Sequence, residues 1–290
     1  MKLNNHMKGI LCILMAAMGF SLMTMFVRLS GDLPVMEKAF FRNAFAAIIS
    51  AVTLIRSEEK FTFKKGSIKF IFWRCLFGSL GLFCNFYAID NMPLADANLL
   101  NKLSPFFAII ASAILLKEKP SKVDVISTVI AFIGVIFIVR PTGDMSVIPA
   151  LAGVAGGFGA GVAYTFVRRL GKLKERTPII VLCFSLFSCT LAVPFIIMNY
   201  KPMTGRQLLC LVIAGTFASI AQFSITSAYK FAPAREISVF DYTQVIFAAI
   251  IGICFFDEIP VALSIIGYVI VLGMAFFRWY WNLKLPAAES

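Results

Sequence analysis

The chain contains an internal repeat whose two copies keep one constant spacing. A shift of 140 residues carries Gly19 onto Gly159 and Arg28 onto Arg168. The same shift links further identical residues along nearly a whole half: Phe26 with Phe166, Val27 with Val167, Ala88 with Ala228, Pro93 with Pro233, Phe107 with Phe247, Glu118 with Glu258 and Pro120 with Pro260. We therefore predict two homologous halves, residues 1–140 and 141–290.

The composition places most of the chain in lipid. Hydrophobic residues make up 60% and charged residues 14% of the 290 positions, and the mean hydropathy is +0.87. Soluble domains are about 45–50% apolar and about 25% charged. A water-soluble fold of this size could not bury so much apolar surface, so we predict an all-α membrane protein.

Apolar segments long enough to cross a bilayer recur along the whole chain. A transmembrane helix needs about 20 predominantly apolar residues. We expect ten spans, at about 9–28, 35–55, 69–90, 94–116, 122–140, 147–167, 178–198, 206–229, 234–256 and 260–281. The connections between them are short, so each half would contribute five helices.

The net charge of +12 fits a membrane topology better than it fits nucleic-acid binding. Lysines and arginines concentrate in alternate connections, and cytoplasmic connections carry the excess of positive charge. With the amino terminus in the cytoplasm, the outside connections hold only Arg28, Arg140, Lys201 and Arg206. We therefore expect both termini in the cytoplasm, a multi-pass location in the cell (inner) membrane, and no nucleic-acid partner.

The two halves differ in charge at equivalent connections. The segment Lys117–Pro120 is basic, whereas its copy Asp257–Pro260 has lost the positive charge. Five spans per half would place these two segments on opposite sides of the membrane. We therefore predict two inverted five-helix repeats, which many transporters use to bind solute between the repeat units near the bilayer midplane.

Sequence patterns for enzymatic or cofactor chemistry are lacking. His6 is the only histidine, and the seven cysteines all fall in apolar stretches without a C-x-x-C pair. No phosphate-binding G-x-x-x-x-G-K-[ST] loop occurs. We therefore expect no catalytic residue, no metal site, no cofactor and no enzymatic activity.

A polar stripe in the fourth predicted span is the strongest candidate site. Asn98, Asn101 and Lys102 lie at helical spacing that places them on one face. The shifted positions in the ninth span bring Ser238, Asp241 and Tyr242. Charged groups within a bilayer are costly and usually face a protein interior or a water-filled cavity. The stripes are therefore expected to line a shared substrate cavity, with Lys102–Asp241 pairing as structural glue between helices as the alternative.

Four residues in other spans are further candidates for the same cavity. Arg42 lies deeper in the second span than a simple interfacial anchor, and Asn85 shares a face with two glycines in the third. Tyr87 and Gln222 are weaker wall candidates, for which ordinary interhelical hydrogen bonding is the alternative. Arg74 begins the third span, where we expect it to extend to the inner surface. Pro105 is expected to kink the fourth span.

Several local motifs resemble EamA-type members of the drug/metabolite transporter superfamily. They are the segment Phe86–Ala97, the run Ser104–Phe107, the run Leu116–Lys119 and the weaker second copy Ala228–Pro233. The resemblance extends through all ten predicted spans. It implies one EamA-like five-helix repeat in residues 1–140 and a second, inverted one in 141–290, around a central cavity with alternating access.

These observations predict a secondary-active transporter of a small polar or amphipathic metabolite. Arg42 and Lys102 against Asp241 leave one net positive charge, which favours a substrate with a carboxylate, such as an amino or organic acid. Asp241 is the candidate site for a coupling proton or cation, and an exchanged solute is the other expected partner besides lipid. The alternatives are a channel-like facilitator and an exporter of cationic or hydrophobic compounds. Neither the direction of transport nor the oligomeric state follows from the sequence.

Overall fold

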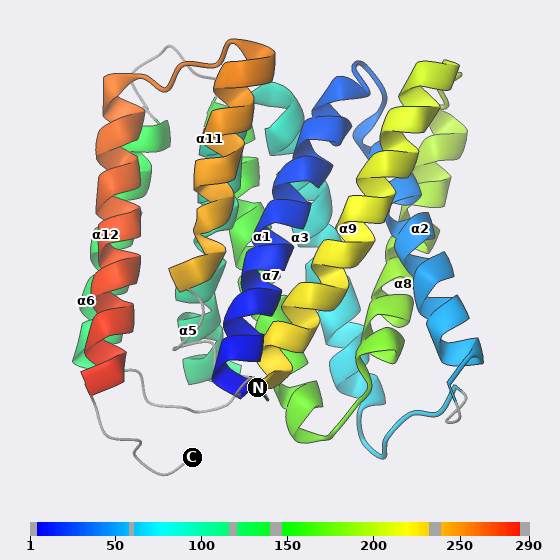
Figure 1. The fold of residues 1–290 in the computed structure, drawn as a ribbon, viewed down its shortest axis with the longest axis horizontal. Coiled ribbons are helices and arrows are strands. Elements are labelled where there is room, and N and C mark those ends of the chain that lie inside the picture. The colour runs from blue at the N-terminus through cyan, green and yellow to red at the C-terminus, as the bar shows by residue number, and fades with distance from the viewer. Residues whose placement is uncertain (1–4, 58–60, 116–120, 140–146, 232–238, 285–290) are drawn as a thin grey trace.

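Helices make up the computed structural model of the chain, which describes residues 5–57, 61–115, 121–139, 147–231 and 239–284 (Figure 1). Within these ranges no strand occurs. The helices are α1 (Asn5–Leu29), α2 (Val35–Ile55), α3 (Ile68–Asn91), α4 (Leu94–Asn101), α5 (Ser104–Leu115), α6 (Lys122–Val139), α7 (Val147–Lys172), α8 (Thr177–Met198), α9 (Gly205–Phe231), α11 (Thr243–Phe256) and α12 (Ala262–Lys284).

Among the described residues, nine helical segments are long and apolar enough to cross a membrane. One of them, Leu94–Leu115, joins α4 and α5, and another runs from Val239 through α11. The chain is thus a multi-pass, all-helical membrane protein, as predicted. The expected fifth span coincides with α6, which is not among the nine, so the count of ten stays a prediction.

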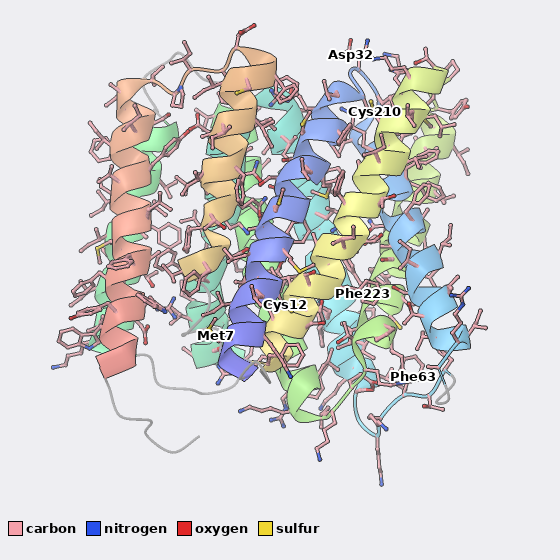
Figure 2. The ribbon with its side chains drawn as sticks, in the orientation of Figure 1. Met7, Cys12, Asp32, Phe63, Cys210 and Phe223 are labelled. Atoms are coloured by element: carbon pink, nitrogen blue, oxygen red, sulfur yellow. The ribbon has the colours of Figure 1, made fainter. Side chains whose placement is uncertain are left out.

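Apolar side chains cover the outer surface of the bundle. On α12, for example, Val269 is 66% exposed, and large apolar residues project outward along the other outer helices as well (Figure 2). In water such continuous apolar patches would drive association. In a bilayer they contact acyl chains, so the same distribution is expected of lipid-facing helices.

The two ends of the bundle are identified by Asp32 and Phe63, which lie at opposite ends (Figure 2). Helix α1 starts near Met7 at the Phe63 end and finishes just before Asp32. Helix α7 runs the other way, because Glu175, shortly after its last residue, accepts a hydrogen bond from the Lys64 amide at 3.0 Å at the Phe63 end. The repeat-related helices α1 and α7 are therefore antiparallel.

Helices of the two halves interleave rather than forming two separate bundles. Helix α1 packs on α9, α3 on α7, α2 on α8 and α6 on α12. The shift of 140 residues carries α1 onto α7 and α3 onto α9, so the first two contacts are copies of each other. The other two each join a helix to its own copy. The packing is thus nearly unchanged when the halves are exchanged.

Glycines bring α7 close to its neighbours. A Cβ atom at Gly159 would lie 2.7 Å from the Gly81 Cα atom, and one at Gly161 would lie 2.5 Å from the Ser104 carbonyl oxygen. Real Cβ atoms do not approach this closely, so only glycine permits α7 to rest against α3 and α5. Small residues serve this purpose in many membrane helices.

Candidate functional site

A polar cavity lies inside the bundle, between helices from both halves. Its volume of about 70 Å³ has room for a few water molecules, whereas ligand pockets typically enclose about 300–1,000 Å³. The helices are therefore closed around it, and a metabolite would enter only after they separate. The polar residues that line it are Arg42, Arg74, Asn85, Asn101, Lys102, Tyr164, Gln222 and Gln244.

One wall of the cavity is formed by a broken helix. Helix α4 ends at Asn101 and α5 begins at Ser104, so Lys102 and Leu103 occupy the break. The Leu103 amide donates to the Leu100 carbonyl at 3.2 Å, three residues back instead of four. Pro105 has no N–H to bond the Asn101 carbonyl and its ring crowds that carbonyl. The kink predicted from Pro105 is confirmed.

A second break occurs at the equivalent position of the other half. Residues 239–241 are helical, Tyr242 forms a turn, and α11 begins at Thr243. The Tyr242 amide donates to the Val239 carbonyl at 3.2 Å, again three residues back. The shift of 140 residues places Tyr242 on Lys102. Here Val245 replaces Pro105, so the second break forms without a proline.

A buried ion pair joins the two breaks. Lys102 Nζ lies 2.6 Å from Asp241 Oδ2, and both side chains are almost fully enclosed. Among the described residues, Asp241 Oδ1 has no hydrogen-bond partner. Lys102 also lines the cavity, so the pair is both an interhelical contact and part of the cavity wall.

Gln244 is a cavity residue that the sequence interpretation did not include. Its Nε2 donates to Asn98 Oδ1 at 2.5 Å, while Asn98 Nδ2 donates to the Leu94 carbonyl at 2.7 Å. Its main-chain carbonyl accepts from Ser21 Oγ at 3.2 Å. The only sequence signal was its repeat position, which matches Ser104, another polar residue at the start of a half-helix. Asn98 itself is buried beside the cavity and is not part of its lining.

Arg42 reaches the cavity from α2, as predicted. Its side chain is 4% exposed, and its terminal nitrogens donate to Asn43 Oδ1 at 2.7 Å and to Gln222 Oε1 at 3.3 Å. The guanidinium carbon lies 5.7 Å from the centre of the Phe184 ring. The Nε atom has no partner in the described part of the chain.

The expectation that Arg74 extends to the inner surface is wrong. Its side chain is 3% exposed, lines the cavity and places its guanidinium carbon 4.1 Å from the centre of the Phe184 ring. The reason lies one turn further along α3. A Cβ atom at Gly78 would lie 2.0 Å from Arg74 Nη1, so the guanidinium rests in space that only glycine leaves open.

The remaining predicted site residues fall in three groups. Asn85 lines the cavity, and its Oδ1 is buried without a partner among the described residues. Tyr242 is buried but is not part of the cavity lining, and its hydroxyl is likewise unpartnered within the described ranges. Tyr87 is 38% exposed and is not brought to the cavity. Ser238 lies outside the described residues.

At the Asp32 end, polar contacts close the bundle above the cavity. Arg28 forms an ion pair with Glu258 and also donates to the carbonyls of Ile89 and Met92. The Glu258 carboxylate also accepts from the Leu94 amide at 2.8 Å. These contacts join α1, the α3–α4 connection and the α11–α12 connection, so segments of both halves are held together there. No group of residues in the described ranges is arranged to hold a metal ion.

Comparison with known proteins gives one family. The EamA-like transporter family matches residues 7–140 and again residues 147–279. The Pseudopaline exporter CntI of Pseudomonas aeruginosa (strain UCBPP-PA14) is 30% identical over 267 residues, covering 91% of this chain and 93% of the relative. Solute carrier family 35 member G1 of Homo sapiens is 30% identical, with 95% of this chain and 81% of the relative covered.

A more distant relative and a solved structure extend the comparison. The Riboflavin transporter of Vibrio cholerae is 26% identical over 68% of this chain and 66% of the relative. A crystal structure matches with a TM-score of 0.71 at 17% identity, covering 96% of this chain and 99% of that one. This last likeness concerns the fold alone.

Proposed function

The chain belongs to the EamA-like transporter family, and on that basis we propose that this membrane transporter is a secondary-active carrier. In this proposal the two halves rock against each other and expose the central cavity to each side in turn. The substrate is a small polar or amphipathic metabolite. Its binding residues are Arg42, Asn85, Asn101, Lys102, Gln222 and Gln244, with Asp241 as the counter-charge.

An inverted-repeat architecture with ten helices is part of the proposal. It is supported by the family match to each half, by the opposite directions of α1 and α7, and by the exchange symmetry of the helix contacts. Helix α6 would be the fifth span and α12 the tenth. The alternation of positive charge along the sequence places both termini in the cytoplasm.

The observation that carries the proposal is the pair of helix breaks at the cavity. Discontinuous helices from two repeats, with unpaired polar groups at their breaks, commonly form solute sites in secondary transporters. Here Lys102 lies at one break and Asp241 directly before the other, and their ion pair spans the interface of the halves. Substrate binding or protonation at Asp241 would loosen that contact and allow the halves to move.

A carboxylate-bearing substrate fits the charges of this site. Arg42 is buried and its Nε is free of partners in the described residues, and guanidinium groups bind carboxylates in a bidentate manner. The names of the relatives (a pseudopaline exporter, a riboflavin transporter) identify organic solutes as the cargo of those proteins. The small, closed cavity favours a carrier over a channel-like facilitator, since an open pore needs a continuous path.

Counterflow in proteoliposomes tests the proposal. A thermal-shift screen against a metabolite library first identifies a ligand, because a true ligand raises the melting temperature with dose. Vesicles loaded with that ligand are then tested for uptake of its labelled form. A carrier gives uptake stimulated by substrate on the opposite side, whereas a pore shows no stimulation. No uptake of any screened ligand would contradict transport itself.

A cavity-filling variant links transport to the site. Asn101→Trp should abolish counterflow because the indole would occupy the space of a few water molecules. Leu80→Trp is the matched control, since Leu80 is 49% exposed on the outer face of α3. Equal activity of both variants would show that solute passes elsewhere.

A further inference from the structure

The charges that line the cavity do not balance. Lys102 and Asp241 neutralise each other in their ion pair. Arg42 and Arg74 remain, and in the described part of the chain neither contacts a carboxylate. Arg42 has only amide oxygens and an aromatic ring as partners, and Arg74 has the aromatic ring. Two positive charges are thus enclosed without counter-ions.

Such an arrangement is costly unless an anion completes it. Arginine stays protonated in proteins, so it cannot escape the cost of burial by losing its charge. An unpaired buried charge is strongly unfavourable, and buried guanidinium groups are normally matched by carboxylate or phosphate. The Nε atoms of both arginines are buried donors without acceptors among the described residues. These donors are therefore available to a ligand.

The two guanidinium groups belong to one local site. They lie 5.7 and 4.1 Å from the centre of the same Phe184 ring, and both line the cavity. They reach it from α2 and α3, so a ligand held by both would connect two helices. Gly78 leaves the room in which the Arg74 guanidinium lies, which indicates that its inward position is built into α3.

We infer that Arg42 and Arg74 form a binding site for a doubly charged anion, and that the transported solute carries two negative charges. This inference rests on the proposed function and specifies its substrate class. Each guanidinium takes one anionic group, or both share one doubly ionised phosphate. The balance differs from the single net positive charge expected from Arg42, Lys102 and Asp241, because that expectation left Arg74 at the inner surface.

Matched acids test the charge requirement directly. Binding of succinate, glutarate and adipate to the purified protein is compared with that of butyrate, valerate and hexanoate, which have the same chain lengths and one carboxylate. Glycerol 3-phosphate forms a separate arm, compared with glycerol. We expect at least one dicarboxylate or the phosphate ester to bind about tenfold or more tightly than its partner compound. The arm that binds distinguishes dicarboxylates from phosphate monoesters.

Arginine variants then assign the second charge to its residue. Arg74→Gln and Arg42→Gln should each weaken dianion binding about tenfold and leave monoanion binding within about twofold. Arg74→Lys should recover part of the affinity because it keeps the charge. The control is Arg206→Gln, which changes an exposed arginine at the start of α9 and should have no effect.

The melting temperature of the ligand-free protein separates binding from a structural role. Arg74→Gln should leave it unchanged or raise it, since the variant removes an uncompensated buried charge. A lower melting temperature together with unchanged dianion preference would mean that Arg74 only supports the fold, and would overturn the inference. Equal binding of dianions and monoanions, or no binding of any dianion at 10 mM (about the weakest affinity of interest here), would overturn it too. Counterflow of a neutral or singly charged solute would leave the proposed transport function intact, so the two failures are distinguishable.

Discussion

At the scale of single residues, the Lys102–Asp241 ion pair connects stability to transport. Both side chains are buried, and the pair joins the two helix breaks at 2.6 Å. Removing one partner of a buried pair typically costs about 3–5 kcal/mol, because the other charge is left without compensation. Replacing both by apolar residues is often neutral, because the desolvation penalty disappears with the charges.

A double-mutant cycle measures which role dominates. Lys102→Met and Asp241→Leu should each lower the free energy of unfolding by about 3–5 kcal/mol, followed by denaturation of the purified protein. The double variant should regain most of that loss and still fail in counterflow. If the double variant transported as well as the unchanged protein, the pair would be structural glue without a part in the cycle.

Residue-level prediction succeeded where burial in lipid leaves a charge few places to go. Lys102 and Asp241 were identifiable because each interrupts an apolar span at equivalent repeat positions. Arg74 was misplaced because distance from the span end was taken as depth, whereas Gly78 allows its side chain to fold inward. Gln244 was missed because a single amide in an apolar helix does not reveal which face it occupies.

At the scale of helices, the glycines of α7 set how closely the halves approach. Gly159→Ala should lower the free energy of unfolding by about 1–3 kcal/mol, the usual cost of forcing extra atoms into a packed interface. The clash would be with backbone atoms of α3, which cannot rotate away. The measurement is the melting transition of the purified protein in detergent.

Gly171→Ala on the same helix is the control. A Cβ atom there would meet nothing within 4 Å, and alanine favours helix over glycine by about 0.5–1 kcal/mol. This variant should be neutral or slightly more stable. Equal losses at both positions would show that helix backbone effects, rather than contact with α3, explain the requirement for glycine.

Prediction of the elements also had a physical boundary. The span positions followed from length and apolar composition, and Pro105 indicated the first break. The second break carries no proline, so the sequence of α11 gave only its repeat relation to Lys102 as a sign. Helix interruption there depends on tertiary contacts that no local pattern encodes.

At the scale of the whole molecule, the repeat was the most informative signal. It predicted an all-helical membrane protein of two related halves, and the chain is multi-pass, helical and matched twice by one transporter family. The interleaving of the halves could not be foreseen, because the apolar faces of membrane helices do not specify their neighbours. The cavity depends on that interleaving, so its wall was predicted only in part.

The inversion of the two halves is the claim on which the transport cycle depends, and sidedness labelling tests it most directly. Seven free cysteines are first replaced, and single cysteines are introduced as Lys122→Cys and Ile259→Cys, in equivalent connections of the two halves. Intact cells are treated with a membrane-impermeant maleimide. We predict that Ile259→Cys is labelled from outside and Lys122→Cys only after the membrane is opened. Labelling of both positions from the same side would contradict two inverted repeats around a shared cavity.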